Sequence, residues 1–240
     1  MSRRASIALA ALIVACSPQG TPPAAEQSPA DALNTLSAAE AAEGFTPLFD
    51  GKDLAGWRGY KMNAAPAGWT VEDGVLTRTT GGGDLVSETE FANFELRLDW
   101  KISPGGNSGV FYRGTEEYEA IYWSAPEMQV LDDAVHADGK NRLTAAGSAY
   151  ALYPAPAGVV KPAGEWNSIR IVVNGNKVEH WLNGQQVVTY ELGSADWTAK
   201  VAASKFNQWP NYGKATRGHI GLQDHGDRVW FRNIRVKMLP

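Results

Sequence analysis

Apolar and polar residues alternate along much of the chain after residue 44. The clearest stretch is Phe94–Ile102, where Phe, Leu, Leu, Trp and Ile occupy every second position and Glu, Arg, Asp and Lys lie between them. Successive side chains of a β-strand point to opposite faces, so this stretch predicts a strand with one face on a core and one in water. We find no long stretch in which apolar residues follow helical spacing.

A three-stranded meander is predicted farther along the chain. Its strands are Ile169–Val173, Val178–Leu182 and Gln186–Tyr190, and the Asn-Gly pairs at 174–175 and 183–184 supply the positive φ angles of tight hairpin turns. Further strand candidates are Trp69–Val71, Val75–Arg78, Gly109–Arg113, Glu127–Leu131, His219–Gln223 and Val229–Lys237. Roughly ten short strands separated by turn signals predict an all-β fold, a β-sandwich or jelly roll.

Three long segments interrupt the predicted strands. Asp132–Tyr150, Pro154–Gly164 and Ser194–Thr216 are rich in Pro, Gly, Asn or Trp and are predicted to be irregular. Long loops on a rigid sandwich are frequent places for binding and catalytic residues. A functional site is therefore expected near these loops.

The first 43 residues differ in composition from the rest. A positive start at residues 1–4, an apolar run to residue 15 and the single cysteine, Cys16, resemble a lipoprotein signal, which predicts cleavage before Cys16 and its lipidation. Residues 16–43 contain no aromatic residue and predict a flexible linker with a helical turn near Ala38–Ala42. We expect one domain at 44–240, held by its lipid in the bacterial cell envelope, on the outer membrane facing the periplasm or on the cell surface.

Charge and motifs exclude several functions. The formal net charge of −4 gives no basic field for a phosphate backbone, so nucleic acid is not expected as a partner. The chain has no glycine-rich turn before a helix, no His-Glu-x-x-His, no cysteine pair and no Gly-x-Ser-x-Gly. Nucleotide-binding, zinc-peptidase and serine-hydrolase functions therefore lose their support.

Polar side chains recur on single faces of two predicted strands. Glu127 and Gln129 share one face, and so do His219, Gln223 and His225. These faces favour a concave surface that binds sugar, although exposure to solvent would explain them too. Trp123, Trp209 and Tyr212 lie in or near loops, where their rings could stack on sugars or pack the loops down. His180 has the same parity as two apolar neighbours and is expected to be a hydrogen-bonded histidine of the core.

Several long motifs resemble one family. They are Phe49–Trp57 (FDGKDLAGW), Asn107–Arg113 (NSGVFYR), Pro126–Asp133 (PEMQVLDD), Val178–Gly184 (VEHWLNG), Gly218–Gly226 (GHIGLQDHG) and Trp230–Ile234 (WFRNI). The chain from about Phe45 to Leu239 is similar to the 3-keto-disaccharide hydrolase domain family. The resemblance implies a concanavalin A-like β-sandwich with long loops around a concave face.

The resemblance also implies a reaction and a set of residues. A ketone at C3 of a hexose acidifies the C2 hydrogen, so a base can remove that proton and expel the anomeric oxygen. Glu127 and His136 are the candidates for proton transfer, followed by Asp132 and His225. Proposed substrate contacts are Asn107, Arg113, Gln129, Lys205 and Trp209. Glu127, Asp132, His136 and His225 carry suitable ligand atoms for a divalent ion, but their spacing is not diagnostic.

Two other functions remain open. A glucanase of the same fold needs two carboxylates beside the scissile bond, and the run Glu127-x-Gln129-x-x-Asp132 has an amide at its centre and a final acid on the opposite face. A non-catalytic carbohydrate-binding lipoprotein would need the amides and aromatic rings but not Glu127 or His136. The preferred function is cleavage of 3-keto-glycosides that a separate sugar 3-oxidoreductase supplies, because nothing in the chain predicts a nicotinamide site.

Overall fold

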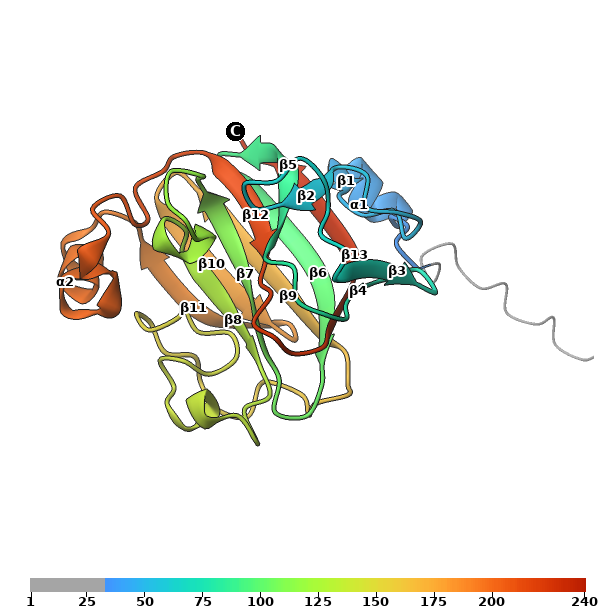
Figure 1. Ribbon diagram of the computed structural model, residues 1–240. Helices are drawn as coiled ribbons and strands as arrows, with labels where there is room; N and C mark the ends of the chain where they lie inside the picture. The colour runs from blue at the N-terminus through green and yellow to red at the C-terminus, as the bar shows by residue number, and fades with distance from the viewer. Residues whose placement is uncertain (1–32) are drawn as a thin grey trace, which may run out of the picture.

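The computed structural model describes residues 33–240, which form two antiparallel β-sheets packed face to face (Figure 1). The larger sheet has the strand order β11-β10-β9-β6-β13-β4-β3, and β1 pairs with β13. Its strands are β1 (Phe45–Pro47), β3 (Trp69–Glu72), β4 (Val75–Arg78), β6 (Phe94–Ile102), β9 (Asn167–Asn174), β10 (Lys177–Leu182), β11 (Gln185–Glu191) and β13 (Val229–Met238). The all-β sandwich expected from the alternation is confirmed.

The smaller sheet has the order β2-β5-β12-β7-β8. Its strands are β2 (Trp57–Gly59), β5 (Leu85–Phe91), β7 (Asn107–Gly114), β8 (Glu127–Leu131) and β12 (Gly218–Leu222). The helical elements are α1 (Ala38–Ala42), α2 (Ala195–Ala203) and the short 3₁₀ turns η2 (Ile121–Trp123), η3 (Ala137–Lys140) and η4 (Lys205–Gln208). Within residues 33–240, none of these helices has the length and apolar character needed to cross a bilayer.

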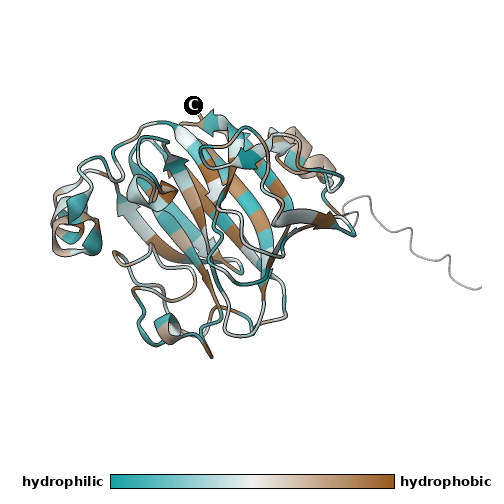
Figure 2. Ribbon diagram, viewed as in Figure 1, coloured by the Kyte–Doolittle hydropathy of each residue, from teal (hydrophilic) through white to brown (hydrophobic). Residues whose placement is uncertain are grey.

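The core lies between the inner faces of the two sheets. Every second residue of β6 is buried, from Phe94 to Ile102, and Trp100 is among the largest side chains with almost no exposed surface. Figure 2 shows the same alternation of apolar and polar positions along the strands. Burial of such side chains supplies the main favourable free energy of folding and fixes the register, because a slip of one residue would turn the apolar set toward water.

The hairpin between β10 and β11 forms as the sequence predicts. Asn183 and Gly184 have φ angles of 50° and 82°, the paired positive values that a type I′ turn requires. His180 on β10 is fully buried, and its ring bonds the Tyr112 hydroxyl at 2.8 Å and the Gly147 carbonyl at 3.2 Å. The expectation of a hydrogen-bonded core histidine is confirmed.

The segment 194–216 is not irregular throughout, contrary to the sequence prediction. It contains α2, which begins where the Ser194 side chain accepts a hydrogen bond from the Trp197 backbone N–H. Of the helix residues, Trp197 alone is buried. A helix that buries a single side chain leaves no apolar stripe in the sequence, which explains why periodicity did not reveal it.

Residues 34–43 are more ordered than the flexible linker that the sequence predicts for residues 16–43. The expected turn at Ala38–Ala42 is a capped helix, in which Ser37 and Glu40 form a reciprocal capping box. The Asn34 and Asn233 side chains each accept the other residue's backbone N–H, and the Arg235 guanidinium donates to Glu40. Residues 34–43 are therefore attached to β13. The predicted signal segment and Cys16 lie outside the described residues.

Candidate functional site

The outer face of the smaller sheet has a depression where β7 and β8 pair. Gly109 lies opposite Gln129 in the register, and Phe111 lies opposite Glu127. Because Gly109 has no side chain, the Glu127 carboxyl group lies over it: a Cβ atom built on Gly109 would be 2.0 Å from Glu127 Oε1. Glycine at this position therefore makes the space that the carboxyl group occupies.

A cavity of about 230 Å³ lies beside this carboxyl group and is called the Glu127 cavity below. It is lined by residues of β7, β8, η2, η4 and the segments that follow β8 and β12: Asn107, Tyr122, Glu127, Gln129, Tyr150, Lys205, Phe206, Gln223 and His225. Most of these side chains are polar, and two are aromatic rings with hydroxyl groups. The lining thus combines hydrogen-bonding groups with flat apolar surfaces, as sites for sugars require.

Glu127 has the electrostatic properties of a proton-transfer group. Its side chain is buried, with 5% of the residue exposed, and burial raises its pKa from 4.5 to about 8. The positive charge of Lys205 opposes this rise, whereas the negative charges of Asp84 and Asp138 add to it. A carboxyl group whose pKa lies near neutral pH can both accept and return a proton during a reaction.

Amide groups around Glu127 have no partner within the described part of the chain. They are Asn107 Oδ1, Gln223 Oε1 and both polar atoms of the Gln129 side chain. Leaving a buried polar group unpaired costs about 1–3 kcal/mol, so native proteins rarely tolerate several at one place. Gln129 and Asn107 are 1% and 3% exposed, so a polar ligand or water molecules inside the cavity would supply the partners of these atoms.

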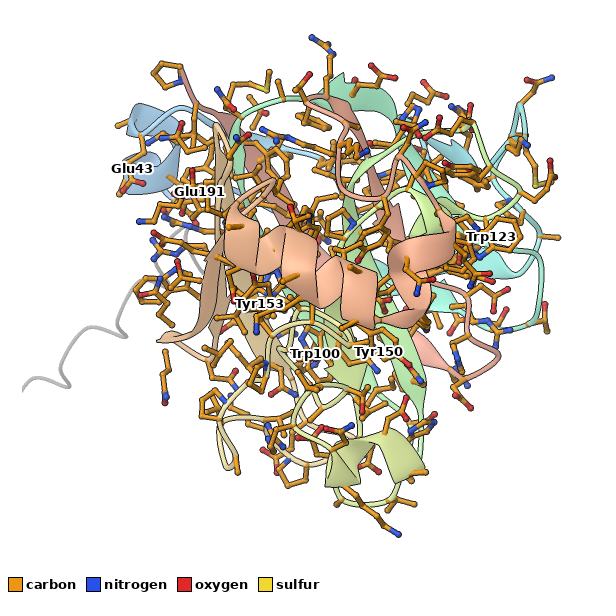
Figure 3. The ribbon with its side chains drawn as sticks, turned by 90° about the vertical axis from the view of Figure 1, so that its left-hand side faces the viewer. Glu43, Trp100, Trp123, Tyr150, Tyr153 and Glu191 are labelled. Carbon is orange, nitrogen blue, oxygen red and sulfur yellow. The ribbon has the colours of Figure 1, made fainter. Side chains whose placement is uncertain are left out.

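The helical segment after β11 forms the other wall of the cavity. Lys205 and Phe206 belong to η4, and the Lys205 ammonium group lies 4.4 Å from the centre of the Tyr150 ring. Figure 3 looks onto α2 and shows Tyr150 below this helical segment, with Trp123 at the opposite end of the segment from Tyr153. The wall brings the Lys205 ammonium group close enough to the buried carboxyl group to interact with its charge.

The loop that carries His225 is braced by a buried ion pair. The Arg78 guanidinium lies 2.6 Å from Asp224, and both side chains are almost fully buried. Asp224 also accepts hydrogen bonds from the backbone N–H groups of Gly82 and Gly83, and Arg78 donates to the Gly226 carbonyl. These contacts hold the residues on either side of His225 in place. His225 itself is exposed and lines the cavity, which places it at the cavity mouth.

Comparison with known proteins assigns the chain to a family. The family described as the 3-keto-alpha-glucoside-1,2-lyase-like domain matches residues 44–237. The chain belongs to this family. A Bacteroides thetaiotaomicron protein named 3-keto-disaccharide hydrolase is 41% identical over 239 residues, which cover 86% of this chain and 82% of the relative. The family resemblance read from the motifs is confirmed.

Solved structures agree with the family assignment. The crystal structure of a proposed glycosyl hydrolase from Parabacteroides distasonis has a TM-score of 0.82 and 37% identity, and the match covers 87% of this chain and all of that one. A Bacillus subtilis protein with a galectin-like fold has a TM-score of 0.54 at 14% identity, and its match covers 81% of this chain and 94% of the other. This second likeness shows the sandwich fold alone.

The structure places five of the predicted site residues around one cavity. They are Glu127 and Gln129 from β8, Asn107 from β7, Lys205 from η4 and His225 from the loop after β12. These residues come from segments far apart in the sequence, and the pairing of β8 with β7 and of β7 with β12 brings them together. These five residues therefore lie together in space, and the role of each remains a prediction.

Two other proton-transfer candidates lie outside the cavity lining. Asp132 accepts hydrogen bonds from the backbone N–H groups of Gly105 and Ala134, so its carboxylate stabilises the turns around it. His136 caps η3, and its Nδ1 accepts the Asp138 backbone N–H at 3.1 Å. The His136 ring centre is 6.5 Å from that of His225, so the two rings are neighbours although only His225 lines the cavity.

Two predicted substrate contacts are also found elsewhere. Arg113 donates hydrogen bonds to the carbonyls of Ala92 and Gly175 and to the Asn93 side chain, and it borders a different cavity. Trp209 stacks on Trp123 with ring centres 5.2 Å apart. Arg113 has a φ of 52°, a departure from strand geometry that alternation cannot reveal.

The four residues considered for a divalent ion do not form a ligand cluster. Within residues 33–240, no group of three or more His, Cys, Asp or Glu side chains has an arrangement that could hold a metal ion. Asp132 is committed to backbone groups, and His136 uses Nδ1 as a helix cap. Within the described residues, the structure therefore contains no preformed ligand set for the divalent ion that the sequence left possible.

Sequence reasoning missed three residues of the cavity. Tyr122, Tyr150 and Phe206 belong to η2, to the long segment after β8 and to η4. Tyr150 and Phe206 lie in segments predicted to be irregular, and Tyr122 lies between two predicted strands. Nothing in the sequence around these residues indicates which other segments they contact. The Tyr150 backbone N–H bonds the Glu127 carbonyl at 3.1 Å, a pairing with the sheet edge that sequence does not show.

Proposed function

We propose that this protein cleaves 3-keto-glycosides, in particular 3-keto-disaccharides. The observation that supports this most is the buried Glu127 carboxyl group, with its raised pKa, in a cavity lined by unpaired amides. The relative named 3-keto-disaccharide hydrolase supports the substrate class. A base with a pKa near 8 suits this substrate, because the neighbouring ketone acidifies the C2 hydrogen that the base must remove.

In the proposed reaction, the ionised Glu127 accepts the proton at C2. The electron pair of the C2–H bond first forms an enolate whose charge lies on the C3 oxygen, and then forms the C1=C2 double bond as the C1–O bond breaks. The leaving oxygen takes a proton. Addition of water at C1 and return of a proton to C2 complete a net hydrolysis, and without this addition the product is the unsaturated keto-sugar.

The cavity contains groups suited to the charged positions of this sequence. The Lys205 ammonium group and the amide of Gln129 can donate hydrogen bonds to the C3 oxygen, where the negative charge of the enolate develops. His225 lines the cavity and is our candidate for the acid that protonates the leaving oxygen. His136 is its neighbour and is the second candidate for proton transfer. The residues that line the cavity include one carboxyl group, so they do not provide the pair that an ordinary glucanase needs.

The experiment that tests this function uses 3-keto-trehalose and unoxidised trehalose, each incubated with the purified protein in heavy water and followed by NMR. We expect cleavage of the keto-sugar, deuterium at its C2 position, and no cleavage of trehalose. Cleavage of both sugars would instead favour an ordinary glycosidase. Saturable line broadening of intact keto-sugar, with no turnover, would favour the carbohydrate-binding alternative and contradict the proposal.

The pKa of Glu127 predicts how the rate depends on pH. Because burial raises this pKa from 4.5 to about 8, most copies of the free protein hold the proton at pH 6 and cannot act as the base. We expect kcat/KM to rise with pH and level off above about 8, with a loss of roughly tenfold for each pH unit below that value. Rates are measured against protein-free controls at each pH, since keto-sugars also eliminate spontaneously. A rate that falls as pH rises through 8 would instead assign Glu127 as the acid.

The cellular setting is a further part of the proposal. The chain contains no motif for a nicotinamide cofactor, so we propose that a separate sugar 3-oxidoreductase makes the keto-sugar. Cys16 is proposed to carry the lipid that holds the protein in the cell envelope. Mass spectrometry of the mature N-terminus would test this, and an unmodified Cys16 preceded by the intact signal segment would contradict it.

A further inference from the structure

A second cavity, larger than the first, lies on the other side of the η4 segment. Its volume is about 470 Å³, and it is called the Arg113 cavity here. Its walls come from α2, the end of β11, the turn between β9 and β10, and residues 207–216. Phe206 and Tyr212, with ring centres 4.0 Å apart, separate it from the Glu127 cavity: Phe206 lines one and Tyr212 lines the other.

The Arg113 guanidinium is a buried cation without an acidic partner. The residue is 4% exposed, and its Nε and Nη2 donate to the neutral oxygens of Ala92, Asn93 and Gly175. Among the described residues, no carboxylate lies close enough to form an ion pair with it, and burial lowers its pKa. Buried charges are normally paired, because removal of an ion from water is costly unless an opposite charge compensates it.

The remaining guanidinium nitrogen of Arg113, Nη1, provides a donor for a ligand. Nη1 donates to no group of the described chain, whereas Nη2 is held by the carbonyl of Gly175, next to Asn176, which also lines the cavity. The guanidinium is therefore fixed in position by three hydrogen bonds and still has a free N–H edge. A fixed cation loses little conformational entropy when it binds an anion.

The rest of the lining is apolar, basic or polar without charge, the last group being Asn176, Thr198, Asn207 and Thr216. The apolar walls are formed by Leu192, Trp197, Val201, Trp209, Pro210 and Tyr212. Lys214 contributes a second positive charge at the exposed rim, and none of the described lining residues is acidic. The Trp197 and Tyr212 rings are nearly parallel, with centres 5.8 Å apart, and both are buried in a stack that continues to Tyr190 on one side and Phe206 on the other. Val201 and Trp209 are partly exposed and give the cavity accessible apolar surface.

We propose that the Arg113 cavity binds a small organic carboxylate with an aromatic or branched apolar body. The carboxylate would pair with Arg113 while the body lies against Val201, Trp209 and the side of α2. The volume falls in the range of small-molecule sites, and the combination of one buried cation with apolar walls is complementary to an amphipathic monoanion. This site does not use the Glu127 cavity and does not depend on the function proposed for it.

The test titrates the full-length protein with phenylacetate and, separately, with its neutral counterpart phenylacetamide. Binding is followed by the indole N–H signals of tryptophan in NMR spectra. We expect saturable shifts for phenylacetate with a Kd on the order of 1 mM, and binding of phenylacetamide at least about tenfold weaker. Equal binding of the two compounds, or no saturable binding of phenylacetate, would overturn the proposal.

A pair of substitutions on α2 locates the bound molecule. Ala202 is exposed and lines the cavity, whereas Ala199 is exposed on the same helix but is not part of the lining. Ala202→Trp should fill the cavity and weaken phenylacetate binding at least about tenfold, and Ala199→Trp should leave it within about twofold. Both substitutions are at exposed positions, so each variant is expected to fold. Equal affinities of the two variants would overturn the assignment to this cavity.

A last control separates the two cavities. Arg113 itself is a poor position for substitution, because its side chain also holds the turns at Ala92 and Gly175. Lys205→Met removes the cation of the Glu127 cavity and should not change phenylacetate binding. Loss of binding in Lys205→Met with normal binding in Ala202→Trp would place the carboxylate beside Glu127 and contradict the proposal.

Discussion

The Glu127→Gln variant should lose cleavage of 3-keto-glycosides by about 10³-fold in kcat while it still binds the uncleaved sugar. Glutamine has almost the same shape as glutamate but cannot accept the C2 proton, so the proton-transfer step is lost and the lining of the cavity is kept. Turnover is measured by NMR with 3-keto-trehalose, and binding by line broadening of the same substrate.

The control for this prediction is Glu165→Gln, which makes the same chemical change at an exposed carboxylate. Its activity should equal that of the unmodified protein. A Glu127→Gln variant that retains more than about a tenth of the activity would remove Glu127 from the role of base. His225 would then be the next group to test, since it also lines the cavity.

The same substitution changes how stability depends on pH. A carboxyl group whose folded pKa is raised from 4.5 to about 8 stabilises the folded state only while it keeps its proton. This contribution is fully present below pH 4.5, is lost as pH rises toward 8, and changes little above that. The melting temperature of Glu127→Gln should therefore depend less on pH across this window than that of the unmodified protein. Thermal melts at several pH values measure this difference, and a cooperative melt also shows that the variant is folded.

The Gly109→Ala variant should lose cleavage by about 10²-fold although the substitution adds only one methyl group. The new Cβ would lie 2.0 Å from Glu127 Oε1, and its next nearest atoms, at 2.7 and 2.9 Å, belong to the same side chain. Gly109 does not have a positive φ, so alanine causes no backbone strain there, and the Glu127 carboxyl group must move instead. Displacement of a reacting group by about 1 Å is enough for a loss of this size.

Gly81→Ala is the matched control, because its Cβ would meet no atom closer than 4.0 Å. Kinetic constants and melting temperature are measured for both variants. We expect Gly81→Ala to match the unmodified protein and Gly109→Ala to lose kcat with only a small change in melting temperature. Normal kcat in Gly109→Ala would show that the observed position of the Glu127 carboxyl group is not the one used in the reaction.

The sequence predicted the regular strands well because each of them carries a local signal. Strict alternation in Phe94–Ile102 reports burial on one face, and Asn183-Gly184 reports a turn, and neither depends on distant parts of the chain. The β1, β2 and β5 strands were missed. The burial pattern of β5 has three buried, then three exposed residues, so this strand does not alternate.

The site was only partly predictable, for a related reason. Glu127 and Gln129 lie on one face of one strand, so alternation places them together without knowledge of the fold. Lys205 and Tyr150 reach the cavity through a helical turn and a sheet-edge pairing that no periodicity records. Asp132 and His136 have suitable chemistry, but backbone N–H groups occupy the Asp132 carboxylate and His136 Nδ1.

The sequence by itself determined the all-β class, the family and the strand that carries Glu127. Each of these three conclusions depends on the alternation of apolar and polar residues or on contiguous motifs, and both are properties of short stretches of sequence. Only the tertiary structure decided which polar residues share a cavity, that Arg113 lies in a different one, and that the Glu127 pKa is raised. The reason is that burial and electrostatic interactions depend on neighbours brought together from distant segments, and no local pattern specifies those neighbours.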